Sequence, residues 1–277
     1  MRNQFEGWYY KHQAKENTIA FIPGRAQDHA FIQVVTDNRA YNIRYPLSVY
    51  QTQGKMLRVG GSTFSDTGVS LEIEHPELRL AGDIQYSGLS PIRGDIMGPF
   101  RFFPMECRHG IISMKHALQG RVFLNGEKYD FTDGVGYIES DSGRSFPNGY
   151  TWVQCSNFVE DCSIMAAVAR IPFYGLKFWG CICIVHLNGR EYRLATYNGG
   201  KILTCKPGRI ELIRGKYHLT VTVNPKNGHK LPAPRFGRME HIIQECLSCH
   251  AEFRFAEGNR VLFTGKSNQA SYECEMP

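Results

Sequence analysis

Short apolar segments, separated by Gly, Pro, Asn and Asp turns, recur along almost the whole chain. β-Branched and aromatic residues dominate them, at the spacing of an antiparallel barrel or sandwich. Before residue 90 the pattern predicts strands at 5–12, 18–22, 30–36, 40–45, 55–64, 69–75 and 78–86. After it, strands are predicted at 111–124, 128–131, 135–139, 151–158, 163–171, 178–187, 191–197, 209–213, 216–223, 250–255 and 261–265. The predicted fold class is all-β.

Three segments depart from this pattern. Residues 89–104 are rich in Pro and Gly and cannot form a central strand, so we expect a long loop or a lid. Residues 225–238 are predicted to be a second, exposed excursion. Residues 239–246 carry apolar side chains at helical spacing, which favours a short amphipathic helix, although the same letters fit a strand.

The two halves of the chain resemble each other weakly. Residues 5–11 align with 131–139, and residues 30–45 align with 181–197. Because an internal repeat indicates repeated architecture, we predict two tandem β-barrel-like domains, at residues 1–119 and 120–277.

Composition excludes several classes of protein. The net charge of +6 is spread along the chain without a Lys/Arg block, so nucleic acid is not an expected partner. Apolar runs are too short to span a bilayer, and the first thirteen residues do not resemble a signal peptide, so we expect a cytoplasmic protein. Nine cysteines at scattered spacings favour reduced, mostly buried thiols, including Cys181 and Cys183.

Known cofactor and catalytic motifs are weak or missing. Cys246, Cys249 and His250 have the spacing of a c-type haem attachment, but the surrounding apolar segment and the missing export signal argue against haem. Zinc would need two more ligands. No phosphate-binding glycine loop and no GxSxG nucleophile motif occur.

The most distinctive stretch is residues 134–158, where carboxylates, amides and large aromatic side chains flank a Gly/Ser/Pro-rich turn. Strand alternation places Tyr137, Glu139 and Asp141 on one face. If that face is shielded from water, a carboxyl group there can act as an acid near neutral pH. The alternative is that Asp141 pairs with Arg144 in the turn and Glu139 is solvated.

The N-terminal strand allows two interpretations as well. Alternation places Glu6, Trp8 and Tyr10 on one face. That row would line a pocket if it faced inward, whereas an exposed edge strand could carry the same residues.

Together these segments resemble the tocopherol cyclase family. The resemblance rests on FEGWYYK at residues 5–11, on GYIESDSGRSFPNGYTWVQCSNF at 136–158, on the run from Met239 to Glu245 and on NQASYE at 268–273. It implies two lipocalin-like β-barrel domains, distantly related to carotenoid hydratases. It also implies an acid that protonates a prenyl double bond so that a phenol oxygen captures the cation, without metal or redox cofactor.

These expectations assign roles to particular residues. We expect Asp141 and Glu139 as acids, oriented by Arg144. The side chains expected to contact substrate are Glu6, Trp8, Tyr10, Tyr137, Trp152, Gln154 and Asn157. The expected partner is a small lipophilic or prenylated molecule, with peripheral membrane contact and the oligomeric state left open. The rival hypothesis is a non-catalytic protein that binds a small lipophile.

Overall fold

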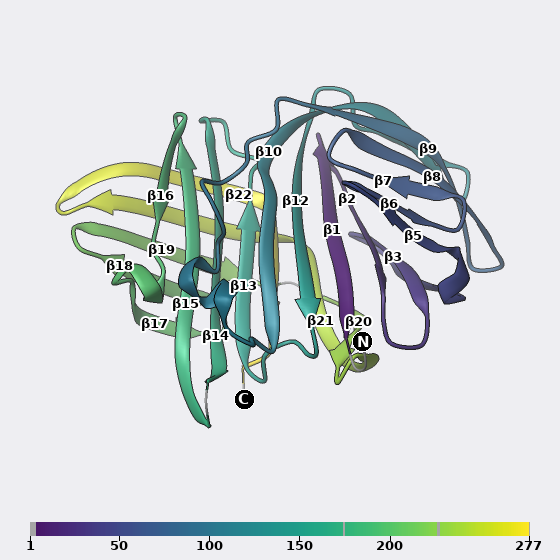
Figure 1. The fold of residues 1–277 in the computed structure, drawn as a ribbon. Helices are drawn as coiled ribbons and strands as arrows, with labels where there is room; N and C mark the ends of the chain where they lie inside the picture. Colours follow the sequence, from purple (N-terminus) through teal and green to yellow (C-terminus); the bar gives the residue numbers. More distant parts are fainter. Residues whose placement is uncertain (1–3, 174, 226–227, 277) are drawn as a thin grey trace. The chain divides into compact units, whose positions relative to one another are not determined.

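Nearly all regular structure in the chain is β (Figure 1). The computed structural model describes residues 4–173, 175–225 and 228–276. Within these residues the only helices are three short 3-10 turns, η1 (Leu47–Val49), η2 (Gly98–Phe102) and η3 (Thr196–Asn198). None of the described helices has the length and apolar character needed to cross a membrane. The all-β prediction is confirmed, while closure of the sheets into barrels stays a prediction.

The first antiparallel sheet has twelve strands among the described residues. Its order is β4-β3-β2-β1-β12-β10-β9-β8-β7-β6-β5, and β11 pairs with β10. The strands are β1 (Phe5–Ala14), β2 (Asn17–Arg25), β3 (Ala30–Thr36), β4 (Ala40–Tyr45), β5 (Tyr50–Gln53), β6 (Met56–Val59), β7 (Ser62–Phe64), β8 (Gly68–His75), β9 (Leu78–Ser87), β10 (Cys107–Leu124), β11 (Glu127–Asp130) and β12 (Gly134–Gly143).

The second antiparallel sheet has ten strands among the described residues. Its order is β16-β15-β14-β13-β22-β21-β19-β18-β17, and β20 pairs with β21. The strands are β13 (Tyr150–Cys155), β14 (Cys162–Phe173), β15 (Leu176–Leu187), β16 (Arg190–Arg193), β17 (Lys201–Lys206), β18 (Arg209–Arg214), β19 (Tyr217–Asn224), β20 (His229–Arg235), β21 (Arg238–Glu257) and β22 (Arg260–Cys274).

The two sheets share the same strand connectivity around their first strands. A four-strand meander, β1–β4 or β13–β16, is followed by a strand that returns to pair with the first, β12 with β1 and β22 with β13. The predicted match of residues 30–45 with 181–197 agrees with this path. The match of 5–11 with 131–139 does not, because residues 134–143 form the returning strand of the first sheet. The counterpart of β1 is β13.

The contacts divide the chain into two interleaved units. The first comprises Met1–Pro91, His109–Ser145 and Leu231–His241, and the second comprises Ile92–Arg108, Phe146–Lys230 and Ile242–Pro277. The predicted boundary between residues 119 and 120 falls inside the continuous strand β10. Strand alternation continues through that point, so the sequence offers no local sign of where a unit ends.

Each unit has its own apolar core. In the first unit the core includes Phe21, Ile32 and Phe64. In the second it includes Val153, Val221 and Phe255. Cys181 and Cys183 belong to this second core, as expected for free cysteines that act as small apolar side chains.

Other local predictions need correction. Residues 239–246 lie in β21, so the strand and not the helix is correct, because tertiary pairing outweighs a short helical spacing. The excursion at 225–238 contains β20, although residues 226–227 lie outside the described residues. Cys246 and Cys249 form a disulfide, which differs from the expected reduced thiols and leaves neither sulfur as a free ligand.

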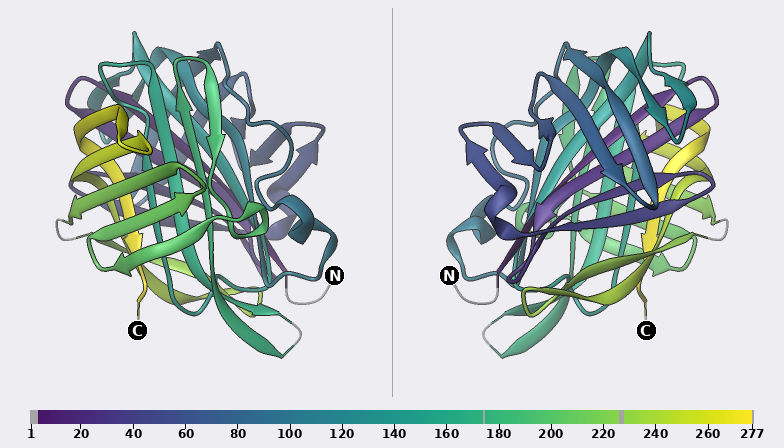
Figure 2. Two further views of the ribbon diagram at one scale, coloured as in Figure 1. Left: turned by 90° about the vertical axis from the view of Figure 1, so that its left-hand side faces the viewer. Right: turned by 90° about the vertical axis from the view of Figure 1, so that its right-hand side faces the viewer.

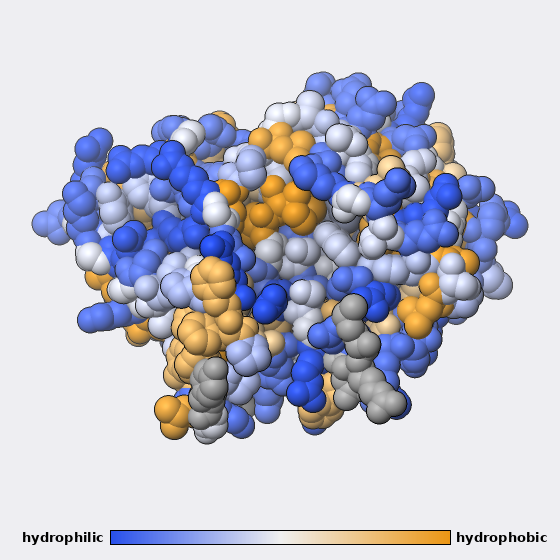
Figure 3. Space-filling model, in the orientation of Figure 1, coloured by the Kyte–Doolittle hydropathy of each residue, from blue (hydrophilic) through white to orange (hydrophobic). Residues whose placement is uncertain are grey.

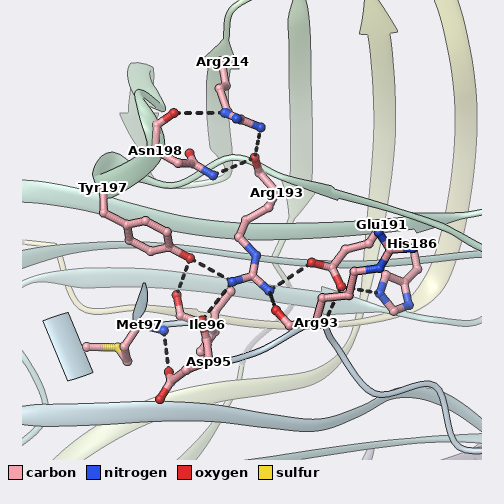
Figure 4. A network of polar contacts seen from close by, with 10 residues as sticks. All are labelled: Arg93, Asp95, Ile96, Met97, His186, Glu191, Arg193, Tyr197, Asn198 and Arg214. Atoms are coloured by element: carbon pink, nitrogen blue, oxygen red, sulfur yellow. Dashed lines mark hydrogen bonds and ion pairs between the residues drawn. The ribbon is translucent and has the colours of Figure 1, made fainter. Parts of the chain in front are cut away.

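Residues 89–104 form no strand, as predicted. In the second unit, Arg193 fixes the start of the 92–108 segment by donating to the backbone oxygens of Asp95 at 2.8 Å and Arg93 at 2.6 Å (Figure 4). The Tyr197 hydroxyl donates to the backbone oxygen of Ile96 at 2.9 Å. The segment is therefore anchored at this end by side-chain donors.

Candidate functional site

The pairing of β1 with β12 decides which side chains of the first unit share a face. Tyr9 lies opposite Glu139, and Lys11 lies opposite Tyr137. Directly opposed residues of an antiparallel pair project to the same side. Tyr9, Lys11, Tyr137 and Glu139 therefore form one row, and all four are buried.

The alternate positions form a separate row. Tyr10 lies opposite Ile138, and both belong to the apolar core of the first unit. Trp8 packs against the same core. The predicted row Glu6, Trp8 and Tyr10 consequently lies on the core face of the sheet, and the row of Tyr137, Glu139 and Asp141 lies on the opposite face.

Glu139 is the centre of a compact polar cluster on that opposite face. The Tyr137 hydroxyl donates a hydrogen bond to Glu139 Oε2. His109, from β10, lies between two carboxylates, with Nε2 3.4 Å from Glu139 Oε2 and Nδ1 3.0 Å from Asp141 Oδ1. The structure thus unites three predicted residues with a histidine 32 positions before Asp141.

Burial sets the electrostatics of this cluster. Removal of the Tyr137 phenol from water, together with the negative charge of Glu139, raises the pKa of Tyr137 well above its ordinary value. Tyr137 therefore remains protonated and acts as a hydrogen-bond donor to the carboxyl group. That donor stabilises the charged form that Glu139 takes after losing a proton.

Exposure increases across the cluster. The side chain of Glu139 is 7% exposed, that of His109 12%, and that of Asp141 23%. Asp141 is thus the member most accessible to solvent, and the imidazole connects it to the most enclosed carboxyl group. A histidine placed in this way can carry protons between the two carboxylates.

The same three residues also have the donor set of a metal site. One ligand atom each from His109, Glu139 and Asp141 lies within 4.8 Å of the others. Imidazole and carboxylate donors suit a divalent first-row metal ion. The cluster is therefore compatible with two functions, a proton relay and a three-ligand metal site.

Glu6 has a different environment from the one expected. Its carboxylate accepts hydrogen bonds from Arg25 Nε and from the Tyr50 hydroxyl, both at 2.6 Å. The hydrogen bond that Arg25 donates to Glu6 is also the main reason why the pKa of Arg25 is raised. Glu6 is thus engaged in a partly buried ion pair on the core side of the sheet.

Arg144 is not the basic partner that the structure shows for Glu139 and Asp141. Its side chain is exposed, and its backbone oxygen accepts a hydrogen bond from Gly237 at 2.6 Å. Among the described residues, the basic partner shown for Glu139 and Asp141 is His109. The alternative interpretation, an Asp141–Arg144 pair within the turn, gives way to a pairing of Asp141 with His109 of another strand.

The remaining predicted residues belong to the second unit. Trp152 and Gln154 are buried on β13, on the face opposite Val153 and Cys155, which are core residues. Gln154 donates to Ser156 Oγ at 2.6 Å. Asn157 is exposed and donates to Gln269. Trp152 and Gln154 thus share a buried face, whereas Asn157 lies outside it.

Two residues, His109 of the cluster and Lys11 of the buried row, were not predicted from sequence. His109 follows the irregular 89–104 segment and belongs to no motif, so only the pairing of strands brings it to Glu139. Lys11 is 1% exposed, which is rare for lysine. Lys11 lies two residues after Tyr9 and therefore on the same face of the strand. This spacing is the signal that could have identified Lys11 as part of the buried row.

Comparison with known proteins places the chain in a family. The family model for tocopherol cyclase-like proteins matches residues 94–275, which is about two thirds of the sequence. The chain belongs to the tocopherol cyclase-like family. The matched region contains His109, Glu139 and Asp141, and the resemblance found in the sequence is confirmed.

Solved structures with little sequence similarity share the fold. Kievitone hydratase from Nectria haematococca superposes with a TM-score of 0.58 at 10% identity, covering 99% of this chain and 90% of that chain. CghA superposes with a TM-score of 0.64 at 8% identity, covering 99% and 88%. CghA with Sch210972 gives a TM-score of 0.65 at 9% identity, covering 99% and 89%.

Proposed function

We propose that this chain is a cyclase- or hydratase-type enzyme that protonates a double bond of a prenylated, apolar substrate, with Glu139 as the acid. The observation that carries the proposal is the buried Glu139 carboxyl group, held by the Tyr137 hydroxyl and linked through His109 to Asp141. Membership in the tocopherol cyclase-like family supports a cyclisation, and the fold shared with kievitone hydratase supports hydration as its variant.

The proposed reaction is balanced without an oxidant or reductant. The Glu139 carboxyl proton moves to one alkene carbon, and the other alkene carbon becomes a tertiary cation. In cyclisation, a phenol oxygen of the same molecule forms the new C–O bond and releases its proton to the Glu139 carboxylate. In hydration, a water oxygen takes the place of the phenol. The acid is regenerated in either case.

The neighbouring groups have complementary roles in this proposal. Tyr137 donates a hydrogen bond to the Glu139 carboxylate during the step, and the faces of Tyr9 and Tyr137 can stabilise the cation by about 0.5–2 kcal/mol each. His109 and Asp141, on the solvent side, exchange the Glu139 proton with solvent between turnovers, so no net proton is taken up during the reaction. Enclosure of the row excludes bulk water that would otherwise capture the cation.

Other parts of the sequence-based hypothesis remain proposals. Trp152 and Gln154 are kept as candidates for contact with the substrate because both are buried on one face of β13. Two lipocalin-like barrels remain the proposed form of the two sheets, and the cytoplasm remains the proposed compartment. We propose that the reaction needs no cofactor.

The Glu139 carboxyl group is the proton donor to test. Glu139→Gln keeps the shape and removes the transferable proton, so kcat on a prenylated hydroquinone should fall at least about 100-fold while substrate binding is retained. Asp141→Asn should lower kcat less and shift its pH profile, since Asp141 acts through His109. Product formation by chromatography and binding by calorimetry measure the two effects.

Controls separate this proposal from its rivals. Glu77→Gln removes an exposed carboxylate from the same unit and should leave turnover unchanged. Full activity in both Glu139→Gln and Asp141→Asn would refute the assignment. Loss of activity on dialysis against a chelator, restored by a divalent metal, would favour the metal site. Recovery of an unaltered lipophile from the purified protein, without turnover of prenylated hydroquinones, would favour a binding protein.

A further inference from the structure

An exposed apolar patch lies on the second unit. It consists of η2 and the adjoining end of the β14–β15 hairpin, and we call it the aromatic patch. Its most exposed large side chains are Phe102 and Leu176, each 74% exposed, and Trp179, 42% exposed. Figure 3 shows apolar surface gathered over these two elements, and Figure 2 shows the end of the hairpin extending beyond the neighbouring strands of its sheet.

The strand register divides the end of the hairpin into two faces. Ile171 pairs with Phe178, and Phe173 pairs with Leu176, so four apolar side chains share one face. The other face is formed by the cross-strand pairs Arg170 with Trp179 and Pro172 with Lys177. One face is thus apolar, and the other combines two cations with a tryptophan.

Aromatic contacts fix η2 against the apolar face. The ring centroid of Phe100 lies 5.8 Å from that of Phe173 and 6.2 Å from that of Phe178. The Phe103 centroid lies 5.3 Å from that of Phe173. These rings form a packed base, and Phe102 next to them points its ring into solvent with the Arg101 guanidinium 4.6 Å from the ring centroid. The exposed side chains are therefore held in place by the fold.

The charges around the patch have one predominant sign. Within the described residues of 98–108 and 170–179, the four cationic side chains are Arg101, Arg108, Arg170 and Lys177, and all are exposed. The acidic side chain in the same segments is Glu106, which is half-buried. A surface complementary to this patch would have an apolar layer deep enough to hold the exposed side chains and negative charges around it.

We propose that the aromatic patch docks the protein on the surface of an anionic lipid bilayer. The hairpin end enters the boundary between headgroups and acyl chains with Phe102 and Leu176 on its apolar side and Trp179 on its other face, because aromatic side chains are favoured there. The four cations remain at the headgroups and contact lipid phosphates. A protein partner would favour a groove or a flat face with paired charges, whereas this patch is a convex hairpin end with an excess of cations. The proposal rests on the patch alone and does not depend on the proposed reaction.

Binding to lipid vesicles tests the proposal. The full-length protein is mixed with vesicles of phosphatidylcholine alone or with about 30% phosphatidylglycerol, neither containing a prenylated quinol. We expect cosedimentation with the anionic vesicles, weakened by high salt because the cations contribute. The fluorescence of exposed Trp179 should shift to the blue and be quenched by brominated lipids, and Trp179→Phe should remove this signal.

Matched variants locate the binding surface. Phe102→Ser/Leu176→Ser should reduce the partition coefficient about tenfold or more, and Arg170→Gln/Lys177→Gln should remove the preference for anionic lipid. The control Leu203→Ser/Val261→Ser changes two exposed apolar side chains elsewhere on the same unit and should bind like the unmodified protein. Circular dichroism confirms that each variant is folded.

Three outcomes would overturn the proposal. These are no vesicle binding by the unmodified protein, equal binding by the patch variant and the control, or a dimer in light scattering that dissociates only in the patch variant. The last result would assign the patch to a second copy of this chain. Failure of vesicle binding with intact turnover of a soluble prenylated substrate would leave the proposed reaction untouched.

Discussion

Buried histidines show how single residues in this protein are controlled by their surroundings. His12 and His116 lie in the first unit, where His12 Nε2 is 2.6 Å from the Tyr86 hydroxyl and His116 Nδ1 is 3.1 Å from Ser113 Oγ. Burial lowers the pKa of His12 to about 3, with a further contribution from His116. Burial likewise lowers the pKa of His116 to about 3. Both rings are therefore neutral in the folded protein at neutral pH.

This produces a defined dependence of stability on pH. The unfolded chain binds protons at these histidines near pH 6.5, and the folded protein does so only near pH 3. The stabilisation is thus fully present above about pH 6.5 and is lost as the pH falls toward 3. Between pH 7.5 and 5.5 each histidine should lower the free energy of unfolding by about 1.4 kcal/mol.

Urea unfolding at the two pH values measures this effect. Relative to the unmodified protein, His116→Gln should reduce the loss of stability by about 1.4 kcal/mol, since this group no longer titrates. An identical loss in His116→Gln would contradict the buried neutral imidazole.

At the scale of elements, glycines mark where strands must approach closely. Gly120 in β10 has φ +141°, and a Cβ built there would lie 2.2 Å from the backbone oxygen of Asp83 in β9. Gly126, in the β10–β11 turn, also has a positive φ of +87°, but a Cβ there would meet no atom within 4 Å. The two positions share unusual backbone geometry and differ in crowding.

Alanine substitution separates these two requirements. Gly126→Ala should cost about 1 kcal/mol of unfolding free energy through backbone strain alone. Gly120→Ala adds a backbone clash that forces β10 away from β9, so it should cost about 3 kcal/mol or more. Thermal and chemical unfolding measure both values. Equal costs would show that the two strands can separate without penalty at this point.

At the scale of the whole molecule, the chain crosses between its two units more than once. Residues 231–241 belong to the first unit, where the amide of Gly237 donates to the backbone oxygen of Arg144 at 2.6 Å and Met239 packs with Phe31. Residues 92–108 belong to the second unit, where Arg193 and the aromatic contacts of Phe100 hold them. Neither unit is a continuous piece of sequence.

Cutting the chain should therefore disrupt both units. Fragments 1–145 and 146–277 each lack a segment that contributes packing and backbone hydrogen bonds, so neither should unfold cooperatively when expressed alone. Mixing them, or joining them through a cleavable linker after residue 145, should restore a cooperative transition by calorimetry. Cooperative unfolding of an isolated fragment would contradict the interleaved arrangement.

Periodicity in the sequence was sufficient for the strands and for local face relations. Alternation with period two placed Tyr137 and Glu139 on one face because successive strand residues point to opposite sides. It could not show that residues 134–143 return to β1 in the first sheet, since β-strand pairing is a non-local choice. The Gly/Ser/Pro turn after β12 looks the same whether a domain begins or ends there.

The residues of the candidate site likewise fall into those that the sequence could predict and those that only the structure could place. An all-β fold, the family and a polar row containing Glu139 and Asp141 could all be predicted from sequence patterns. The folded structure was needed to show that His109 joins that row, that Glu6 pairs with Arg25 on the other face, and that Arg144 is exposed. Local periodicity fixes where a side chain points along its own strand. Register between distant strands, which carries no local signature, fixes what that side chain meets.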